Sequence, residues 1–468
     1  MLKDLNNRIE EMRDNIIATT QELVRIKSVQ DTPKEGKPFG EGVNKALEAT
    51  LEIAKNMGFE TGNIDGYAGY AEMGQGDEML GILCHLDVVP EGSNWSYPPY
   101  AAEIHDDKIY GRGTIDDKGP AVAALYAMKA VKDSDITLNK RVRIIFGTNE
   151  ESGWGGMDYY LENAEVPDLG FSPDAEFPVI HAEKGILIFK LKEEFESVDN
   201  EGTVKVKSIK GGNAPNMVPD HCEAELEGNY QQIKEKLNEF LTKNDYDMSL
   251  EKNDDLVLLK SEGVSAHGSM PADGQNAISQ LMTFLGTLDL GEDDIAEFIS
   301  FYNDKIGMEY YGQSIGCGFE DEVSGKLIFN VGVIDLSSKK GEITVNIRYP
   351  VTNKAETVYS EIKDKLNKDI ELEETQAKDP LYVEKDDPLV KNLMEVYRDI
   401  VGDEDSEPIA IGGGTYARAI EKAVAFGPLF PGQIELAHQK DEYIGIPELI
   451  QNAKIYAGAV AALASENK

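Results

Sequence analysis

Cysteines and long apolar runs are scarce in this chain, and both shortages narrow the classes of protein to which it can belong. Its three cysteines, Cys84, Cys222 and Cys317, are too few and too widely spaced for a disulfide framework or a zinc-binding cysteine motif. No run of about 18 apolar residues occurs, and residues 1–27 lack the unbroken apolar stretch of a signal peptide. These features predict a cytoplasmic protein without a membrane-spanning segment.

Positive charge is also in short supply. The chain has 46 Lys and Arg against 86 Asp and Glu, which gives a formal net charge of −40. Such an excess of negative charge disfavours binding to nucleic acid and to anionic membranes. We therefore expect no nucleic-acid partner and no membrane partner, and we interpret most acidic residues as part of a solvated surface.

The length and the texture of the chain predict two domains. At 468 residues the chain exceeds what one hydrophobic core usually supports. Apolar strand-like runs alternate with helical segments from Asn44 to about Glu183, and this texture returns after Asp387. Such alternation is typical of an α/β domain with a mostly parallel sheet flanked by helices. Residues 185–384 instead show alternating polar and apolar positions with amphipathic helices, which predicts an inserted α+β domain. The first domain, 1–184 plus 385–468, is therefore discontinuous.

Several elements can be placed individually. We expect buried strands at 79–84 and 141–146, alternating strands at 186–191 and 203–209, an apolar helix at 121–131, and further helices at 230–241, 355–366, 389–400 and 447–464. Polar residues follow the two buried strands: His85 and Asp87 come after the first, and Glu150 and Glu151 come after the second. Because ligands of open α/β sheets bind beyond the carboxyl ends of strands, this edge is the expected site.

These polar residues are of the types that bind divalent metals. Asp87 lies two positions after His85, so both side chains could point to one side of the strand. The Asp87 carboxylate could then orient the His85 imidazole from the side of the ring that faces away from a metal. The pair Glu150 and Glu151 offers one carboxylate as a ligand and one as a proton shuttle. Asp116 lies in a glycine-flanked loop before a helix, which can bring one carboxylate against two cations. Alone, a histidine after a strand or an Asp-Asp pair is commonplace, but the constellation, with Asp174 and His438, predicts a two-metal hydrolase.

Five segments carry a resemblance to a known enzyme family, namely 81–90, 111–119, 148–153, 172–178 and 437–442. They look like the motifs of the two-zinc peptidases that include aminoacylases, succinyl-diaminopimelate desuccinylases and dipeptidases, in matching order along nearly the whole chain. Within this family the chain most resembles PepV-type bacterial dipeptidases, because of its long middle segment and the strings at 216–220 and 412–418.

The resemblance implies a role for each residue of the predicted centre. His85 and Asp174 would hold one Zn²⁺, Glu151 and His438 would hold a second, and Asp116 would bridge both, with Mn²⁺ or Co²⁺ as possible replacements. Glu150 would be the general base. The resemblance also implies a cis peptide bond between Asp116 and Asp117.

The inserted domain resembles the lid of this family. The segment 263–268 is similar to a lid motif whose histidine, here His267, donates to the oxyanion, and Asn216 and Arg348 match residues that hold substrate. Gly414, in the second string, is a further candidate for substrate binding. Taken alone, His267 would more often be a structural loop histidine, and Arg348 could merely form a surface ion pair.

The sequence therefore predicts a metal-dependent dipeptidase that cleaves dipeptides with a free C-terminal carboxylate, using a metal-bridging water activated by Glu150. The alternative enzyme is an N-acyl amino acid deacylase or desuccinylase with the same metal core. A catalytically silent peptide-binding relative would be expected to lack a ligand or Glu150. We expect short peptides as substrates and a monomer, because the long lid supplies in one chain what shorter relatives obtain by dimerisation.

Overall fold

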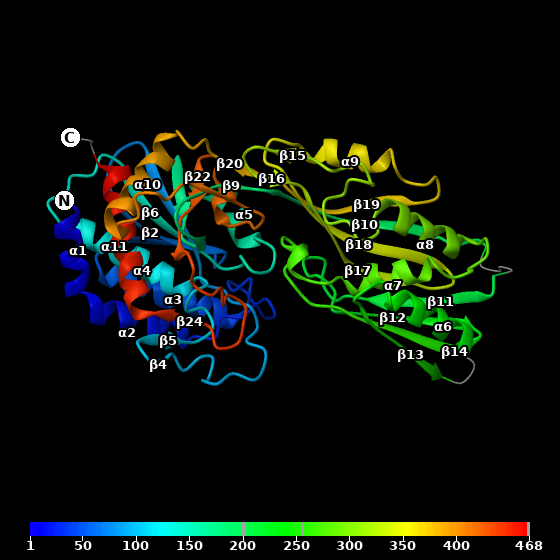
Figure 1. Cartoon of the computed structure of the whole chain (residues 1–468). Coiled ribbons are helices and arrows are strands. Elements are labelled where there is room, and N and C mark those ends of the chain that lie inside the picture. The colour runs from blue at the N-terminus through cyan, green and yellow to red at the C-terminus, as the bar shows by residue number, and fades with distance from the viewer. Residues whose placement is uncertain (198–201, 254–255, 466–468) are drawn as a thin grey trace. The chain divides into compact units, whose positions relative to one another are not determined.

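The computed structural model describes residues 1–197, 202–253 and 256–465 (Figure 1). The chain divides into two compact units, each with an apolar core of its own. Unit 1 comprises Met1–His181, Tyr382–Ile409 and Gly414–Lys468, and unit 2 comprises Ala182–Leu381 and Ala410–Gly413.

Unit 1 is built on a nine-stranded sheet with the order β1-β2-β6-β3-β7-β22-β9-β20, in which β21 pairs with β9. The central strands β6, β3, β7 and β22 are parallel, whereas β1, β2 and β9 pair antiparallel. The strands are β1 (Glu60–Ile64), β2 (Ala68–Gly74), β3 (Met79–His85), β6 (Arg141–Gly147), β7 (Leu169–Ser172), β9 (Ile180–Glu183), β20 (Leu381–Tyr382), β21 (Ile409–Ile411) and β22 (Ala423–Ala425).

The predicted α/β class is confirmed, with a parallel centre and antiparallel edges. The edge at β1 and β2 is a hairpin whose turn contains Asp65 and Gly66, both with positive φ. Three residues, 65–67, lie between the paired Ile64 and Ala68, and Asp and Gly are favoured in such turns because they tolerate left-handed backbone. This local signal accounts for an antiparallel pair in a sheet that was expected to be mostly parallel.

The parallel centre is covered by helices, which explains why its strands are apolar. Every residue of β3 is buried, and α4 (Lys118–Lys132) and α11 (Ile446–Ala464) pack against β3, β6 and each other. In Figure 1, α11 lies beside α4 in this unit. The remaining helices are α1 (Leu2–Glu11), α2 (Arg13–Val24), α3 (Glu41–Asn56), α5 (Gly155–Asn163), α10 (Pro388–Val401) and the 3₁₀ turn η2 (Tyr416–Ala419).

Two smaller sheets complete unit 1. One contains β4 (Glu103–His105), β5 (Lys108–Tyr110) and β24 (Tyr443–Gly445) in the order β24-β5-β4. The other pairs β8 (Ala175–Glu176) with β23 (Pro428–Leu429). The pairing of β24 with β5 joins residues near the C-terminus to the segment that precedes α4.

Unit 2 is built on an eight-stranded sheet with the order β13-β14-β12-β11-β17-β18-β10-β19. All of its neighbouring strands pair antiparallel. Buried and part-exposed residues alternate along β10, as expected for a sheet with one face on a core. The strands are β10 (Gly185–Glu194), β11 (Val204–Gly211), β12 (His221–Gly228), β13 (Asp247–Asn253), β14 (Leu256–Glu262), β17 (Ile328–Leu336), β18 (Lys340–Tyr349) and β19 (Glu371–Lys378).

Helices supply the rest of the unit 2 core, and α7 packs against β12, β14 and β17. The helix predicted at 230–241 is present with the same bounds, whereas the helix predicted at 355–366 ends at Lys363. The elements are α6 (Tyr230–Leu241), η1 (Pro271–Asp273), α7 (Ala277–Leu285), α8 (Asp294–Lys305), α9 (Ala355–Lys363) and the short strands β15 (Glu320–Asp321) and β16 (Gly325–Lys326).

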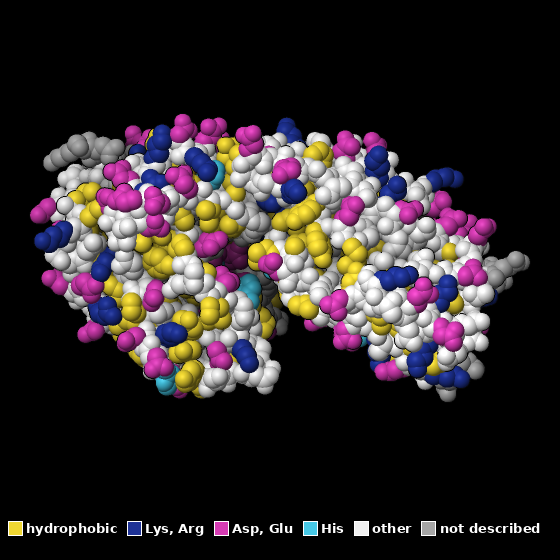
Figure 2. Space-filling model, viewed as in Figure 1, with side chains coloured by type: hydrophobic (Ala, Val, Ile, Leu, Met, Phe, Trp, Pro, Cys, Tyr) yellow, Lys and Arg dark blue, Asp and Glu magenta, His cyan; other side chains and the backbone are white. Residues whose placement is uncertain are grey.

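The acidic residues are spread over the visible face of the molecule and interspersed with Lys and Arg (Figure 2). This distribution agrees with the interpretation of most carboxylates as a solvated surface. Within the described residues, no helix has both the length and the apolar character that crossing a bilayer requires.

Candidate metal centre

The predicted ligands of unit 1 come together at one edge of the sheet. His85 is the last residue of β3, Glu150 and Glu151 follow β6, and Asp174 follows β7. Because β3 is parallel to β6 and to β7, their carboxyl ends lie at the same edge. The loop before α4 adds Asp116, and the loop before β24 adds His438.

Asp116 lies between two histidines. Its Oδ1 is 2.8 Å from His85 Nε2, and its Oδ2 is 3.0 Å from His438 Nε2. On the two outer sides, Asp174 Oδ1 is 3.7 Å from His85 Nε2, and Glu151 Oε2 is 2.9 Å from His438 Nε2. The residues thus form two three-membered groups that share Asp116, and each group could hold one metal ion.

The tautomer of His85 supports this interpretation. Its Nδ1 lies 3.0 Å from the backbone carbonyl of Asp87, which can only accept, so Nδ1 carries the proton in the neutral ring. The lone pair of the buried Nε2 then faces carboxylate oxygens, which are also acceptors, and Nε2 has no hydrogen-bond partner among the described residues. A divalent cation would satisfy this set of donors, so the side chains fit a metal site.

Asp87 acts differently from the expectation that its carboxylate would orient the His85 ring. The carboxylate is 3.6 Å from Nδ1, which is longer than a hydrogen bond. Instead its two oxygens accept from the backbone N–H groups of Glu150 and Glu151, at 3.0 and 3.1 Å. Asp87 is 1% exposed, so this buried carboxylate anchors the loop that carries both glutamates.

Glu150 is held from a position that the sequence did not reveal. Its Oε1 accepts a 3.0 Å hydrogen bond from Trp154 Nε1. Trp154 has a φ of +67°, in the left-handed region. Burial raises the pKa of Glu150 well above its usual range, and the negative charge of Asp174 adds to the increase. A carboxylate with a raised pKa suits a proton shuttle.

The pKa values of the other ionisable groups also shift, because several carboxylates lie together in a buried site. Burial raises the pKa of Glu151 to about 7 and that of Asp174 to about 6. Burial also acts to raise the pKa of Asp116, but its close contacts with the imidazole rings of His438 and His85 outweigh that effect and lower the pKa. Burial lowers the pKa of His438, but contacts with Asp116 and Glu151 raise it to about 11. The centre therefore favours added positive charge.

The peptide bond between Asp116 and Asp117 is cis, as the resemblance implied. Asp117 is 0% exposed, and its Oδ2 accepts a 3.0 Å hydrogen bond from the backbone N–H of His85. Sequence reasoning assigned no role to Asp117, Trp154 or Glu442. Asp117 stood beside a predicted ligand and could have been singled out, whereas the contact of Trp154 had no local signal.

The structure places in unit 2 two predicted substrate-binding residues, Asn216 and Arg348, and the predicted oxyanion donor His267. Asn216 and His267 are exposed neighbours, because the Asn216 carbonyl accepts from the Gly268 N–H at 2.7 Å. His267 Nδ1 accepts from the Ser269 N–H at 3.2 Å, so the neutral ring carries its proton on Nε2. Arg348 is 6% exposed, and its Nε donates to Asn346 Oδ1 at 3.0 Å.

Asn330 links these residues through the sheet of unit 2. It lies opposite Asn346 in the pairing of β17 with β18, and its Nδ2 donates to the carbonyls of Pro215 and Met217. The loop that carries Asn216 is therefore tied to the strands beside Arg348. Gly414 belongs to unit 1, where its backbone lies against the guanidinium of Arg418.

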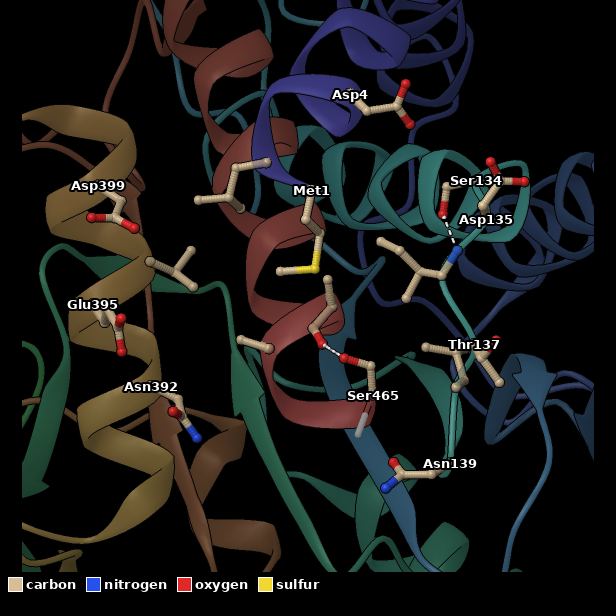
Figure 3. Close-up of a pocket in the computed structure, with 16 residues that line it drawn as sticks. Met1, Asp4, Ser134, Asp135, Thr137, Asn139, Asn392, Glu395, Asp399 and Ser465 are labelled. Carbon is tan, nitrogen blue, oxygen red and sulfur yellow. Dashed lines mark hydrogen bonds between the residues drawn. The ribbon is translucent and has the colours of Figure 1, made fainter. Parts of the chain in front are cut away.

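A cavity of about 850 Å³ lies elsewhere in unit 1 (Figure 3). Its lining includes Asn139, which precedes the amino end of β6, whereas the cluster lies beyond the carboxyl end of that strand. The described lining contains carboxylates, such as Asp4 and Glu395, but no histidine. This cavity is therefore separate from the candidate metal centre.

Comparison with known proteins identifies the family. Residues 81–462 match "Peptidase family M20/M25/M40". The chain belongs to this family. It is therefore a hydrolase of the metallopeptidase class, and its cluster of His, Asp and Glu is compatible with the divalent metals of M20/M25/M40 enzymes.

Relatives of this M20/M25/M40 chain cover nearly its whole length. "Putative dipeptidase YtjP" from Bacillus subtilis (strain 168) is 42% identical over 466 residues, which is 98% of this chain and 100% of the relative. A "Putative dipeptidase" from Staphylococcus epidermidis is 37% identical over 467 residues, covering 98% of this chain and 99% of the relative.

Solved structures share the fold. Human carnosine dipeptidase 1 has a TM-score of 0.57 at 15% identity and covers 99% of each chain. The dipeptidase Dug1p from Saccharomyces cerevisiae has a TM-score of 0.57 at 12% identity, with 99% of this chain and 98% of that chain covered. At these identities the likeness concerns the fold alone.

Proposed function

We propose that this chain is a dipeptidase that needs two divalent metal ions, Zn²⁺ in the first place, and that it cleaves dipeptides with a free C-terminal carboxylate. The observation that carries the proposal is the double group of ligands that shares Asp116, with one histidine at each of its oxygens. Full-length relatives named as dipeptidases support the choice of substrate.

In this proposal His85 and Asp174 hold one ion, Glu151 and His438 hold the other, and Asp116 bridges them. When bound, paired ions polarise the scissile carbonyl and acidify a water. Glu150 accepts a proton from the attacking water and passes it to the leaving amine. Its hydrogen bond from Trp154 supports this role, because it fixes the direction of the carboxylate.

We further propose that unit 2, which contains most of the predicted lid (185–384), recognises the substrate. The guanidinium of Arg348, with Asn216, would bind the free carboxylate, since Arg is the natural bidentate partner of that group. His267 would donate from Nε2 to the oxyanion, and the acceptance of a hydrogen bond at its Nδ1 supports this tautomer. Gly414, in unit 1, is a further proposed substrate-binding residue. We propose that the chain acts as a monomer.

A substrate panel tests the proposal. Metal-free protein is reconstituted with measured Zn²⁺, Mn²⁺ or Co²⁺ and assayed on dipeptides, tripeptides, dipeptide amides and N-acyl amino acids. We expect hydrolysis of free dipeptides and much weaker hydrolysis of the amides and tripeptides, whose carboxylate is masked or displaced by about 3.5 Å. Preference for N-acyl or N-succinyl amino acids would instead identify a deacylase.

A further inference from the structure

Arg112 and Glu442 form a buried ion pair between the loops that carry Asp116 and His438. Arg112 Nη1 lies 2.6 Å from Glu442 Oε2, and the two side chains are 2% and 0% exposed. Desolvation of two charges largely offsets their attraction, so a buried ion pair is a poor source of net stability. A role in positioning the two loops accounts better for placing these charges in the interior.

Glu442 reaches the backbone beside Asp116. Its Oε1 accepts from the N–H of Ile115 at 3.0 Å and lies 3.4 Å from the hydroxyl of Thr114. Its carbonyl accepts from the N–H of Gly111 at 2.9 Å. Ile115 directly precedes Asp116. The buried carboxylate of Glu442 therefore supports the backbone of the loop that carries the shared ligand.

The loop that carries His438 needs such support, because it contains no regular structure between β23 and β24. The His438 side chain is 55% exposed. Near it, both carboxylate oxygens of Asp441 accept from Ser96, from the N–H at 2.6 Å and from the hydroxyl at 2.9 Å. Glu442 is the next residue, and β24 then pairs with β5.

The loop of His438 and the loop of Asp116 both adjoin the same end of the strand pair formed by β24 and β5. Tyr443 pairs with Tyr110, so Glu442 leads away from the ladder on one strand where Gly111 leads away on the other. The side chain of Glu442 therefore spans the point at which the two ligand loops separate. Its contacts thus join the loop of His438 to the loop of Asp116.

The two proposed metal positions depend on this contact to different degrees. His85 is held by the ladder of β3, by its N–H bond to Asp117 and by the Asp87 carbonyl. Asp174 is separated from the end of β7, a strand of the same sheet, by one proline. The other position includes His438, whose loop is anchored through Glu442. Loss of Glu442 should thus weaken the second position more.

We propose that Glu442, paired with Arg112, is a positioning residue that sets the spacing of His438 and Asp116 and thereby the affinity of the metal position formed by Asp116, Glu151 and His438. This inference rests on the two-metal function proposed above. Residues that support ligands from behind typically change metal affinity by about 10- to 100-fold when replaced.

The central test is Glu442→Gln, which keeps the shape of the side chain and an acceptor for the Ile115 N–H but removes the charge opposite Arg112. Zinc equivalents and affinities are measured by chelator competition and elemental analysis, together with the thermal unfolding of metal-free protein. The parent should bind two equivalents. In the variant, one equivalent should keep its parent affinity and the other should weaken by about 10- to 100-fold.

Three further variants separate positioning from general destabilisation. The double variant Arg112→Gln with Glu442→Gln leaves no unpaired buried charge and should show the same selective loss. Glu448→Gln removes a carboxylate from α11 and should keep both affinities. Leu393→Ala opens the core in α10 and should lower the unfolding temperature without selective metal loss.

The His438→Ala background tests whether Glu442 acts through His438. One equivalent should remain there, and adding Glu442→Gln should not weaken it further. A parent with one equivalent overturns the two-metal function and this assignment with it. A parent with two equivalents overturns the positioning role alone if Glu442→Gln keeps both affinities, weakens both equally, or still lowers affinity in the His438→Ala background.

Discussion

Replacing Glu150 by Gln separates proton transfer from metal binding. Glu150 Oε1 accepts from Trp154 Nε1 at 3.0 Å, and a glutamine carbonyl oxygen can accept the same hydrogen bond. The backbone N–H of residue 150 still donates to Asp87, because that contact does not involve the side chain. We therefore expect an unchanged fold and unchanged metal content in Glu150→Gln.

The catalytic loss should be large, since an amide does not accept a proton at neutral pH. A positioned general base contributes about 10²- to 10⁴-fold to turnover. At about 1.36 kcal/mol for each factor of ten, this corresponds to about 2.7–5.4 kcal/mol of transition-state stabilisation. The fall should appear in kcat, with KM changed little, because Glu150 is proposed to act on the water rather than to bind the substrate.

The matched control is Glu151→Gln, which makes the same chemical change at the next residue. Glu151 Oε2 lies 2.9 Å from His438 Nε2, so its charge belongs to a proposed metal position. We expect this variant to bind metal more weakly and to regain activity when metal is added in excess. The assay combines kcat and KM on one dipeptide with metal equivalents and unfolding temperature for each protein.

Two results would refute this reasoning. If Glu150→Gln lost metal while Glu151→Gln kept it and turned over slowly, the base and the ligand would be exchanged. If Glu150→Gln retained turnover within about threefold of the parent, Glu150 would not be the general base, whatever its metal content.

Three further variants address the shared ligand and the proposed lid. Asp116→Ala should abolish binding of both ions, because each of its oxygens faces one histidine; elemental analysis that finds one ion retained would contradict this. Arg348→Ala should lower kcat/KM on a free dipeptide by about ten- to a hundredfold, the value of a charge-assisted contact of about 1.5–3 kcal/mol, with little further loss on the amide. Unchanged discrimination between dipeptide and amide would place the carboxylate contact elsewhere. His267→Ala should act mainly on kcat, since its contact strengthens as oxyanion charge develops, and a change confined to KM would exclude that role.

Sequence patterns were sufficient for features that depend on neighbouring residues. The buried strands and the helix after Asp117 follow from apolar runs, and the texture change near residue 184 follows from the switch to alternating strands. Polar residues at strand ends marked the candidate centre for the same reason, because parallel strands end at a common edge. The resemblance of five motifs then pointed to the peptidase family.

The antiparallel edge of the unit 1 sheet and the bounds of some helices were less accessible. The hairpin of β1 and β2 has a local sequence signal, because the pair Asp65 and Gly66 is typical of hairpin turns, but this hairpin was not among the predicted elements. The helix that ends at Lys363 was predicted to continue to residue 366, since the amphipathic pattern extends beyond the last helical turn.

The chain by itself determined which residues stand at the ends of the central strands, because the position of each strand follows from a local apolar run. Only the tertiary structure decided how those residues are held. The Asp87 carboxylate holds the backbone of Glu150 across 63 positions, and Glu442 contacts Arg112 across 330 positions. His438 likewise meets Asp116 from a loop near the C-terminus. Such contacts depend on the packing of segments that are distant in sequence, so no local pattern encodes their geometry.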